Sequence, residues 1–132
     1  MNRLYKPTPD GYCGAEDNGQ TSAWYIFSAM GFYPVCPGTD QYVFGAPLFK
    51  KMTIHLENGN KLIVDASENS ERNFYVGQSR WNNKPWNKNW FNHFDLIKGG
   101  TLHFKMQSQP DYKRGIDVAA FPYSFSKDEK SK

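Results

Sequence analysis

The sequence lacks any long apolar run. No stretch approaches the roughly 20 consecutive apolar residues that cross a bilayer as a helix. The opening residues, "MNRLYKPTPD", also lack the apolar core of a secretory signal peptide. We therefore expect no transmembrane segment in this chain, and if the parent protein is exported, we expect its signal to lie outside these 132 residues.

A concentrated basic surface is missing as well. The formal net charge is only +3, and the Lys and Arg residues are scattered. A nucleic-acid-binding protein would show a basic stripe interleaved with aromatic residues, so this class is not expected. The sequence also contains no phosphate-binding loop and no dinucleotide fingerprint.

Metal-binding residue types are sparse. The three histidines, His55, His93 and His103, lie far apart and form no pair at ligand spacing, so we interpret them as strand-face residues. Cys13 and Cys36 flank the most apolar segment without a neighbouring Cys or His at ligand spacing. They are compatible with a disulfide or with free thiols, and we favour free, partly buried thiols. These residues therefore predict no metal site.

Aromatic side chains are what the sequence has in excess. They make up 17% of a chain that is 39% apolar and 22% charged, so a disordered chain is not expected. Such an excess is typical of a β-rich core or of a surface that stacks on ring-shaped ligands such as sugars. We favour the core, because most aromatic side chains in proteins are largely buried.

A helix is predicted over "TSAWYIFSAMGFYPV", after an extended lead-in at residues 1–18. Gly31 suits the left-handed position that ends a helix, and Pro34 prevents its continuation. The segment is apolar around nearly its whole circumference, which predicts burial on all sides. The chain offers no second convincing helix to bury it, which indicates an incomplete fold. Its start can be capped by the side chains of Asp17, Asn18, Thr21 or Ser22.

Alternating apolar residues predict strands after Pro37. The segment "KKMTIHLENGNKLIVDAS" predicts a hairpin that turns at Asn58-Gly59. Further strands are predicted in "QYVFG", "RNFYVGQSRW", "WFNHFDL" and "TLHFKMQ", and "AAFPYSF" is predicted to dock last. The predicted fold class is mainly β (α+β): one buried N-terminal helix followed by an antiparallel β-sandwich-like module.

Glu16 and Asp17 stand in a glycine-bounded loop directly ahead of the predicted helix. Acids at this place stabilise free backbone N–H groups and the helix dipole, and from the residues alone we favour this capping role. The alternative is that one of these carboxylates acts as a general base or as a metal ligand. Gly14 and Gly19 fit both interpretations, because glycine permits a tight turn or a close approach to a ligand.

The segment "SRWNNKPWNKNWF" gathers Trp81, Trp86 and Trp90. One interpretation is a loop that stacks on sugars. The other is a hairpin connection whose rings plug the edge of a core, and we favour this second interpretation.

The run "GAEDNGQTSAWYIFSAMGFYPVCPG" strongly resembles a motif of glycoside hydrolase family 92, the calcium-dependent, inverting, exo-acting α-mannosidases of the α-1,2-mannosidase type. That motif reads Gly-x-(Glu or Asp)-Asp-x-Gly-Gln, then Ser-Ala-Trp-Tyr and Gly-Phe-Tyr-Pro-Val, and residues 14–35 match it in order. The segments "YVFGAPLFKKMTIHL", "NFYV" and "HFDLIKGGTLHFKM" follow the family's C-terminal pattern. The resemblance covers essentially the whole chain.

The resemblance implies the C-terminal portion of a longer enzyme, with an N-terminal β-sandwich and an (α/α)6 barrel ahead of it. Residues 1–36 are then the end of the catalytic barrel with the acidic loop and its final helix, and residues 37–124 are a C-terminal antiparallel β-rich module. Residues 125–132 are a polar tail. The missing barrel explains the orphan helix, and family habit implies a periplasmic, cell-surface or secreted parent.

The resemblance also implies inversion at mannose-containing glycans by a carboxylic acid and an opposed carboxylate base. Asp17 is the expected catalytic base, with Glu16 next. Gln20 and Trp24 are the expected substrate-binding residues, Gln20 orienting the sugar or the water and Trp24 packing behind the loop. Ca²⁺ is the expected cofactor, with most ligands, and the general acid, in the upstream region. We therefore expect the isolated chain to be inactive.

The sequence departs from the family motif at one position, and two other functions of the chain stay open. Ala15 stands where many family members carry Asn or Asp, which puts the holding of the catalytic water in doubt. A non-catalytic carbohydrate-binding module would use exposed, coplanar rings of Trp81, Trp86 and Trp90. A structural interface module would instead leave an apolar patch exposed on this chain.

Overall fold

The computed structural model describes residues 4–128, and its fold is mainly β with one long helix. The predicted fold class is thereby confirmed. Of the predicted polar tail, residues 129–132 lie outside the described part. The elements in chain order are α1 (Gln20–Met30), β1 (Phe32–Tyr33), β2 (Gln41–Phe44), β3 (Lys51–His55), β4 (Lys61–Asp65), β5 (Tyr75–Trp81), β6 (Lys84–Pro85), β7 (Trp90–Asn92), α2 (His93–Leu96), β8 (Gly100–Gln107), the 3-10 helix η1 (Val118–Ala120) and α3 (Phe125–Asp128).

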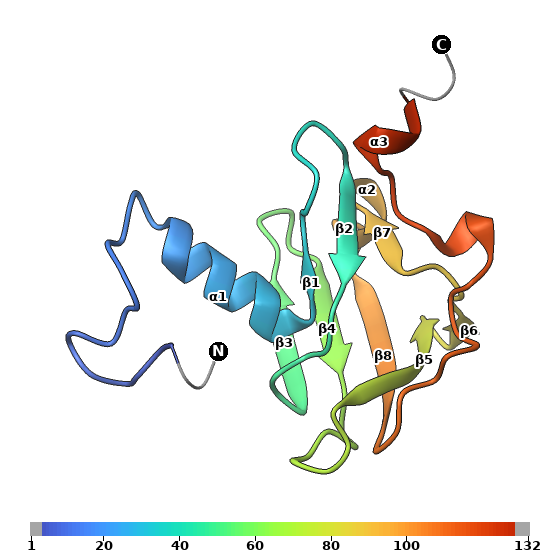
Figure 1. The fold of residues 1–132 in the computed structure, drawn as a ribbon, viewed down its shortest axis with the longest axis horizontal. Coiled ribbons are helices and arrows are strands. Elements are labelled where there is room, and N and C mark those ends of the chain that lie inside the picture. The colour runs from blue at the N-terminus through green and yellow to red at the C-terminus, as the bar shows by residue number, and fades with distance from the viewer. Residues whose placement is uncertain (1–3, 129–132) are drawn as a thin grey trace.

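Two sheets form the body of the molecule (Figure 1). One has three strands in the order β1-β2-β7, and the other has five in the order β3-β4-β8-β5-β6. Their inner faces meet through aromatic rings: Phe44 of β2 lies 5.3 Å from Phe104 of β8, and Phe91 of β7 lies 4.9 Å from Trp81 of β5, between ring centroids. The predicted core role is therefore confirmed for part of the aromatic excess, while other aromatic side chains, such as Tyr112 and Phe125, are exposed.

One strand pair runs in a direction that the sequence did not predict. β4 and β8 are parallel, with Leu62 opposite Gly100 and Asp65 opposite His103. The chain forms β5, β6, β7 and α2 between these strands, so no hairpin fixes their relative direction. By contrast, the predicted hairpin at Asn58-Gly59 is confirmed, with β3 and β4 antiparallel and Gly59 at φ 82°.

The predicted strand "WFNHFDL" is only half correct. β7 ends at Asn92, and residues His93–Leu96 form the single helical turn α2. His93 therefore opens a helix and does not lie on a strand face. Its ring Nδ1 lies 3.1 Å from the hydroxyl of Tyr42, which ties α2 to β2.

The predicted side-chain caps of α1 are wrong. The N-cap is Gly19, in the left-handed conformation at φ 79°, and it makes no side-chain capping bond. The carboxylate of Glu16 instead accepts a hydrogen bond from the backbone N–H of Ser22 at 3.4 Å. The predicted helix end is confirmed, because Gly31 has φ 89° and donates its N–H to the carbonyl of Ser28.

Only the C-terminal end of α1 enters the core. Ala29 and Met30 are buried, and the ring of Phe27 stacks on that of Tyr42 at 5.9 Å. Ile26, on the outer side of the helix, is 53% exposed. Within the described residues α1 is thus covered along one side and one end, although its composition predicts burial all round.

Gly31 gives a stability prediction with an internal control. A Cβ at this position would lie 2.8 Å from the backbone nitrogen of Pro47, and the φ of 89° disfavours any L side chain. We expect Gly31→Ala to lower the free energy of unfolding by about 2–4 kcal/mol, from backbone strain plus overpacking. Gly38 has φ 85° with nothing within 4 Å of its Cβ, so Gly38→Ala isolates the strain. Equal losses in urea unfolding for the two variants would contradict the clash with Pro47.

The tryptophan-rich segment plugs the core, as favoured. Trp86 lies parallel to Phe91, at 4.2 Å and 5°, whereas Trp81 meets Phe91 at 65°. The two indoles are therefore steeply inclined to each other. The third ring, Trp90, is half-buried beneath the Lys88 amine, which lies 4.2 Å from its centroid. The exposed coplanar sugar platform predicted as an alternative is wrong.

The C-terminal segment docks as predicted. The N–H of Asn89 donates to the carbonyl of Ala120 at 2.9 Å, and Ala120 is buried. The N–H of Tyr123 donates to the side-chain oxygen of Gln41 at 2.7 Å. Residues 120–123 thus run along the edge of the three-stranded sheet.

Candidate functional site

The acidic loop begins with a tight turn in the lead-in. The N–H of Lys6 donates to the carbonyl of Gly11 at 3.0 Å, and the N–H of Gly11 donates to the carbonyl of Thr8 at 2.9 Å. A Cβ at Gly11 would collide with the carbonyl oxygen of Lys6, so this position requires glycine. The turn sends residues 12–17 toward the start of α1.

Two tyrosines of the lead-in, Tyr5 and Tyr12, hold it against α1. Tyr5 stacks on Trp24 with centroids 5.7 Å apart at 16°, and it lies 5.1 Å from Tyr25. The hydroxyl of Tyr12 lies 2.9 Å from that of Ser22. Partial burial, the Cys13 thiol and the Glu16 carboxyl raise the pKa of the Tyr5 phenol, in that order. Neither tyrosine was predicted from the sequence, because their role depends on contacts across the turn.

The structure separates the two acids of the loop. Glu16 caps the helix through Ser22, as described above. Asp17 uses its backbone carbonyl to accept the N–H of Gln20 at 3.0 Å, while its side chain is exposed. Among residues 4–128, no side chain or backbone group pairs with the Asp17 carboxylate. The capping role therefore belongs to Glu16, and Asp17 remains available for chemistry.

The Asp17 side chain is open to solvent and lies two residues ahead of the N-cap residue, Gly19. An ionised carboxylate open to solvent can accept a proton from a water molecule. Gln20, the first residue of α1, is also exposed, whereas Trp24 is half-buried behind the loop under Tyr5.

The neighbours of the two acids differ in backbone conformation and in surroundings. Gly19 adopts the left-handed conformation expected of it. Gly14 has no positive φ, and a Cβ there would meet nothing within 4 Å, so contacts in the described residues do not require glycine. Ala15 is exposed, and its carbonyl accepts a bond from the Thr21 hydroxyl at 3.4 Å.

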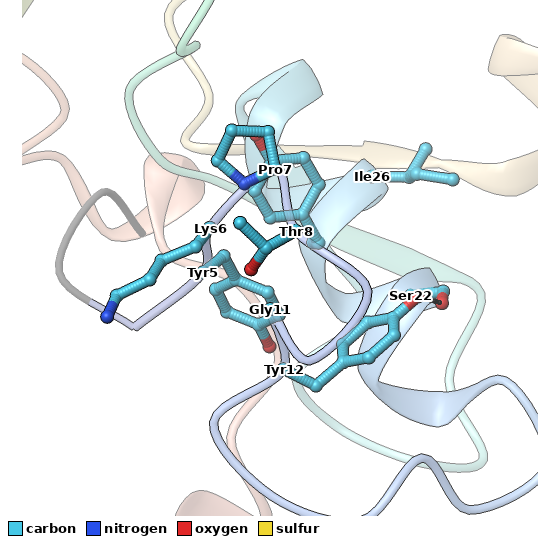
Figure 2. A pocket seen from close by; sticks show the side chains of 9 residues that line it. Tyr5, Lys6, Pro7, Thr8, Gly11, Tyr12, Ser22 and Ile26 are labelled. Atoms are coloured by element: carbon cyan, nitrogen blue, oxygen red, sulfur yellow. Dashed lines mark hydrogen bonds between the residues drawn. The ribbon is translucent and has the colours of Figure 1, made fainter.

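A cavity of about 710 Å³ opens between the lead-in and the outer side of α1 (Figure 2). Its lining is largely apolar and aromatic, with Tyr5, Tyr12 and Ile26 labelled in the view. Ile26 and Tyr12 are 53% and 48% exposed. The described residues therefore leave an apolar surface uncovered beside α1, and neither Glu16 nor Asp17 is among the residues that line it.

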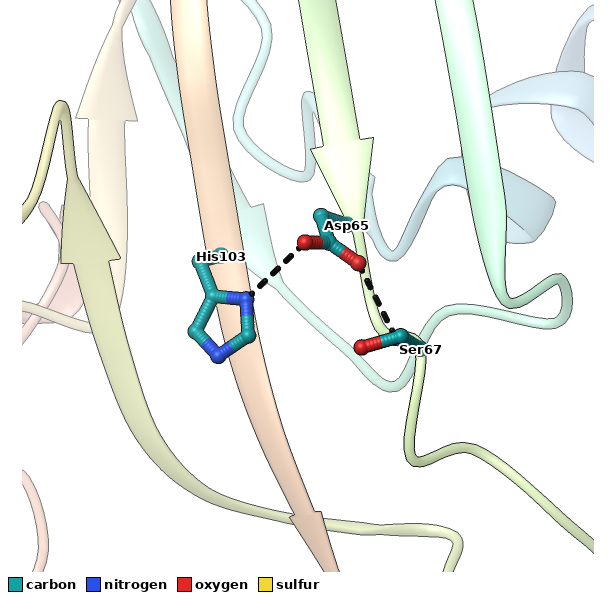
Figure 3. A network of polar contacts seen from close by, with 3 residues as sticks. All are labelled: Asp65, Ser67 and His103. Atoms are coloured by element: carbon teal, nitrogen blue, oxygen red, sulfur yellow. Dashed lines mark hydrogen bonds and ion pairs between the residues drawn. The ribbon is translucent and has the colours of Figure 1, made fainter.

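The second cluster of titratable groups lies on the outer face of the five-stranded sheet (Figure 3). His103 Nδ1 lies 3.3 Å from Asp65 Oδ2, and the other oxygen of Asp65 accepts the backbone N–H of Ser67 at 3.1 Å. Ser67 contributes its backbone N–H, so the three residues do not form a Ser–His–Asp relay. Across residues 4–128, no group of three His, Cys, Asp or Glu side chains is placed to hold a metal ion.

Both cysteines are free thiols, as favoured. Cys36 is half-buried, whereas Cys13 is exposed, so the predicted partial burial is wrong for Cys13. No helix within residues 4–128 is long and apolar enough to cross a membrane.

Comparison with known proteins identifies the family. Residues 1–108 match the family model of the "Glycosyl hydrolase family 92 catalytic domain". This match covers most of the chain, so the protein belongs to glycosyl hydrolase family 92. The resemblance predicted from the acidic motif is thereby confirmed.

Solved structures agree with this assignment. A family GH92 inverting mannosidase from Bacteroides thetaiotaomicron is 49% identical over 95% of the chain, with a TM-score of 0.85. A GH92 alpha-mannosidase from the same species, also solved in complex with mannoimidazole, is 37% identical over 94% of the chain, with a TM-score of 0.88. A curated "Uncharacterized secreted glycosidase" of Arthroderma benhamiae is 27% identical over 105 residues, 77% of the chain.

The chain is much shorter than these relatives. It covers 17% of each Bacteroides mannosidase chain and 14% of the fungal glycosidase. The region that the family model matches includes the acidic loop, α1 and every strand of the two sheets.

Proposed function

We propose that this chain supplies the catalytic base of an inverting exo-α-mannosidase. One observation in the acidic loop carries the proposal. Glu16 caps α1, whereas the Asp17 carboxylate has no partner among the described residues. Membership in family 92 and the mannosidase names of the related structures support it.

The proposed mechanism is a single displacement at the anomeric carbon. Asp17 takes a proton from water as the water oxygen attacks, and a protonated carboxylic acid on the opposite side gives its proton to the departing glycosidic oxygen. Inverting enzymes hold the two carboxyl groups roughly 6.5–9.5 Å apart, which leaves room for that water. Gln20 orients the sugar or the water, and Trp24 holds the loop through Tyr5. We assign the general acid to segments outside this chain.

The proposed substrate is a mannose-containing glycan, with α-1,2-linked mannose as the first linkage to test. We further propose that the parent enzyme is exported, which the secreted fungal relative supports. Its N-terminal β-sandwich and barrel are the proposed partners that cover the outer side of α1.

Calcium remains a proposal for the complete enzyme. Ca²⁺ takes six to eight oxygen ligands, and residues 4–128 bring no three acidic or imidazole groups together to begin such a set. The side chains of residues 4–128 therefore do not by themselves form a Ca²⁺ site. We propose that its ligands come mainly from outside the chain.

A structural interface module is the second candidate function. It is favoured by the exposed Ile26 and Leu4 and by the apolar cavity between the lead-in and α1. On this proposal the chain only docks the β-sheets onto the rest of the enzyme, and Asp17 plays no chemical part.

A segment exchange tests the proposed function. In the Bacteroides inverting mannosidase of 49% identity, the matching segment is replaced by residues 1–132 of this protein. We expect this chimera to release mannose from α-1,2-mannobiose with Ca²⁺ present, and the isolated chain to release none. Clear release by the isolated chain would refute the placement of the acid elsewhere. An active chimera that keeps its activity after Asp17→Asn would favour the interface module.

A further inference from the structure

A polar cavity of about 430 Å³ lies between the β5–β6 hairpin and residues 111–117. In Figure 1 this region is at the opposite side of the molecule from α1 and the lead-in. Pockets that hold small ligands are commonly about 300–1,000 Å³, so a single sugar ring fits this volume. This cavity has no part in the proposed catalytic function or in the packing of the two sheets.

The cavity is lined by hydrogen-bonding groups of both kinds. Arg80, Lys113 and Arg114 supply donors, and Asp111 and Asp117 supply acceptors. A bare anion would be attracted by the three cations and repelled by the two carboxylates. A neutral sugar suits the lining better, because each hydroxyl group donates and accepts at once.

Arg114 is a pre-positioned donor in this cavity. Its guanidinium donates to Asn89 Oδ1 at 2.8 Å and to Ser79 Oγ at 3.1 Å, and Ser79 is only 4% exposed. These two bonds use two of its five N–H groups. Burial lowers the pKa of Arg114, against the opposing effect of Asp111. No carboxylate within residues 4–128 forms an ion pair with it, so its remaining donors lack a charged acceptor.

Two further polar groups are free for a ligand. Asp117 precedes η1 but makes no capping bond to it, and Asn87 follows Trp86 in the connection between β6 and β7. Both residues are exposed, and neither side chain has a hydrogen-bond partner among the described residues. Free polar groups that converge with a fixed guanidinium are typical of a binding site.

Trp86 adds an apolar wall. Its ring is fixed by the stack on Phe91 and by the hydrogen bond from its Nε1 to the carbonyl of Trp90 at 3.0 Å. Pro85 lies beside it in the lining. A sugar ring has apolar C–H faces and a polar rim, so it matches one aromatic wall surrounded by donors and acceptors.

We propose that this cavity is a saccharide-binding site that takes one neutral hexose residue. Arg114 and Asn87 donate to ring hydroxyls, Asp117 accepts from one, and the part of Trp86 that lines the cavity contacts C–H groups of the sugar. The hexose class follows from the lining, and only the choice of a mannoside as the first probe rests on the proposed function.

The test uses the 132-residue chain and ¹H–¹⁵N NMR. Methyl α-D-mannopyranoside, with the glucose and galactose analogues beside it, is titrated while the Asn87 amide and Trp86 indole resonances are followed. We expect saturable shifts of these resonances with a Kd on the order of 1 mM for at least one hexoside. Asp117→Ala and Asn87→Ala should each raise that Kd about 10-fold, because each removes a ligand hydrogen bond.

Glu57→Ala is the matched control, since Glu57 is exposed in the β3–β4 connection far from the cavity. It should leave the Kd unchanged, and unaltered thermal unfolding of all three variants shows that the fold is retained. The proposal is overturned if no hexoside shifts the pocket resonances, if both pocket variants bind as wild type, or if only inorganic phosphate at matched ionic strength shifts them. Asp17→Asn should bind the hexoside normally, so failure of the catalytic proposal is distinguishable from failure of this one.

Discussion

Replacing Asp17 by Asn is expected to lower the kcat of the active chimera by a factor of about 10²–10⁴, the usual contribution of a general base. The amide is nearly isosteric with the carboxylate but cannot take a proton from water. The Asp17 side chain has no structural partner among the described residues, so the fold should be unaffected. Initial rates of mannose release with α-1,2-mannobiose give the measurement, and KM should change little because the ground-state sugar contacts remain.

Glu16→Gln is the matched control one residue away. Glu16 accepts the N–H of Ser22, a bond that the Gln side chain can still accept without charge. We expect a small loss of stability, about 0.3–1 kcal/mol from the weaker interaction with the helix dipole, and a much smaller loss of kcat. A larger kcat loss in Glu16→Gln than in Asp17→Asn would reverse the assignment of base and cap.

Azide distinguishes a lost base from a displaced loop. Azide attacks the anomeric carbon without giving up a proton, so it needs no general base. In Asp17→Asn it should restore turnover and give β-mannosyl azide, while the acid still protonates the leaving oxygen. A loop that has moved would not be rescued in this way. Absence of rescue in a folded variant would argue for a positioning role of Asp17.

The sequence predicted best what depends on neighbouring residues. The Asn58-Gly59 hairpin and the end of α1 at Gly31 follow from local backbone preferences, and both are confirmed. The parallel pairing of β4 with β8 was not predicted. The alternation of apolar and polar residues is the same in parallel and antiparallel strands, so it does not give the relative direction of two strands joined by a long connection. The sequence predicts a strand at residues 93–96, where the structure has a helical turn. Over so few residues, the apolar positions fit the period of a helix as well as that of a strand.

In the candidate site, too, the sequence did not predict the features that depend on contacts in three dimensions. The motif located Glu16 and Asp17, but composition could not say which acid caps the helix. That division depends on Gly19 and Asn18 both taking left-handed conformations, which lets Glu16 reach the N–H of Ser22. Tyr5 and Tyr12 carry no signal in a single sequence, since their importance comes from contacts with Trp24 and Ser22 across a turn.

Phe91→Ala is expected to lower the free energy of unfolding more than any other substitution considered for this chain. Phe91 is fully buried, with 0% exposure, where the two sheets meet. Its ring lies 4.2 Å from Trp86, 4.9 Å from Trp81 and 5.4 Å from Phe44 between centroids. Truncation of a buried Phe to Ala costs about 3–5 kcal/mol. A domain of this kind is stable by about 5–15 kcal/mol in total, so the variant should lose roughly a fifth or more of its stability.

Urea unfolding followed by tryptophan fluorescence measures this loss, and Phe94→Ala is the control. Phe94 lies three residues further along the chain and is 64% exposed, so its truncation should change the free energy of unfolding by no more than about 0.5 kcal/mol. A loss at Phe91 no greater than at Phe94 would contradict the packing of the sheets through this ring. In the chimera, Phe91→Ala should lower the melting temperature while leaving kcat per folded molecule nearly unchanged, because the rings that Phe91 contacts, Phe44, Trp81 and Trp86, all lie outside the acidic loop. The pair Asp17→Asn and Phe91→Ala therefore separates the chemistry at the helix start from the sheets that carry it.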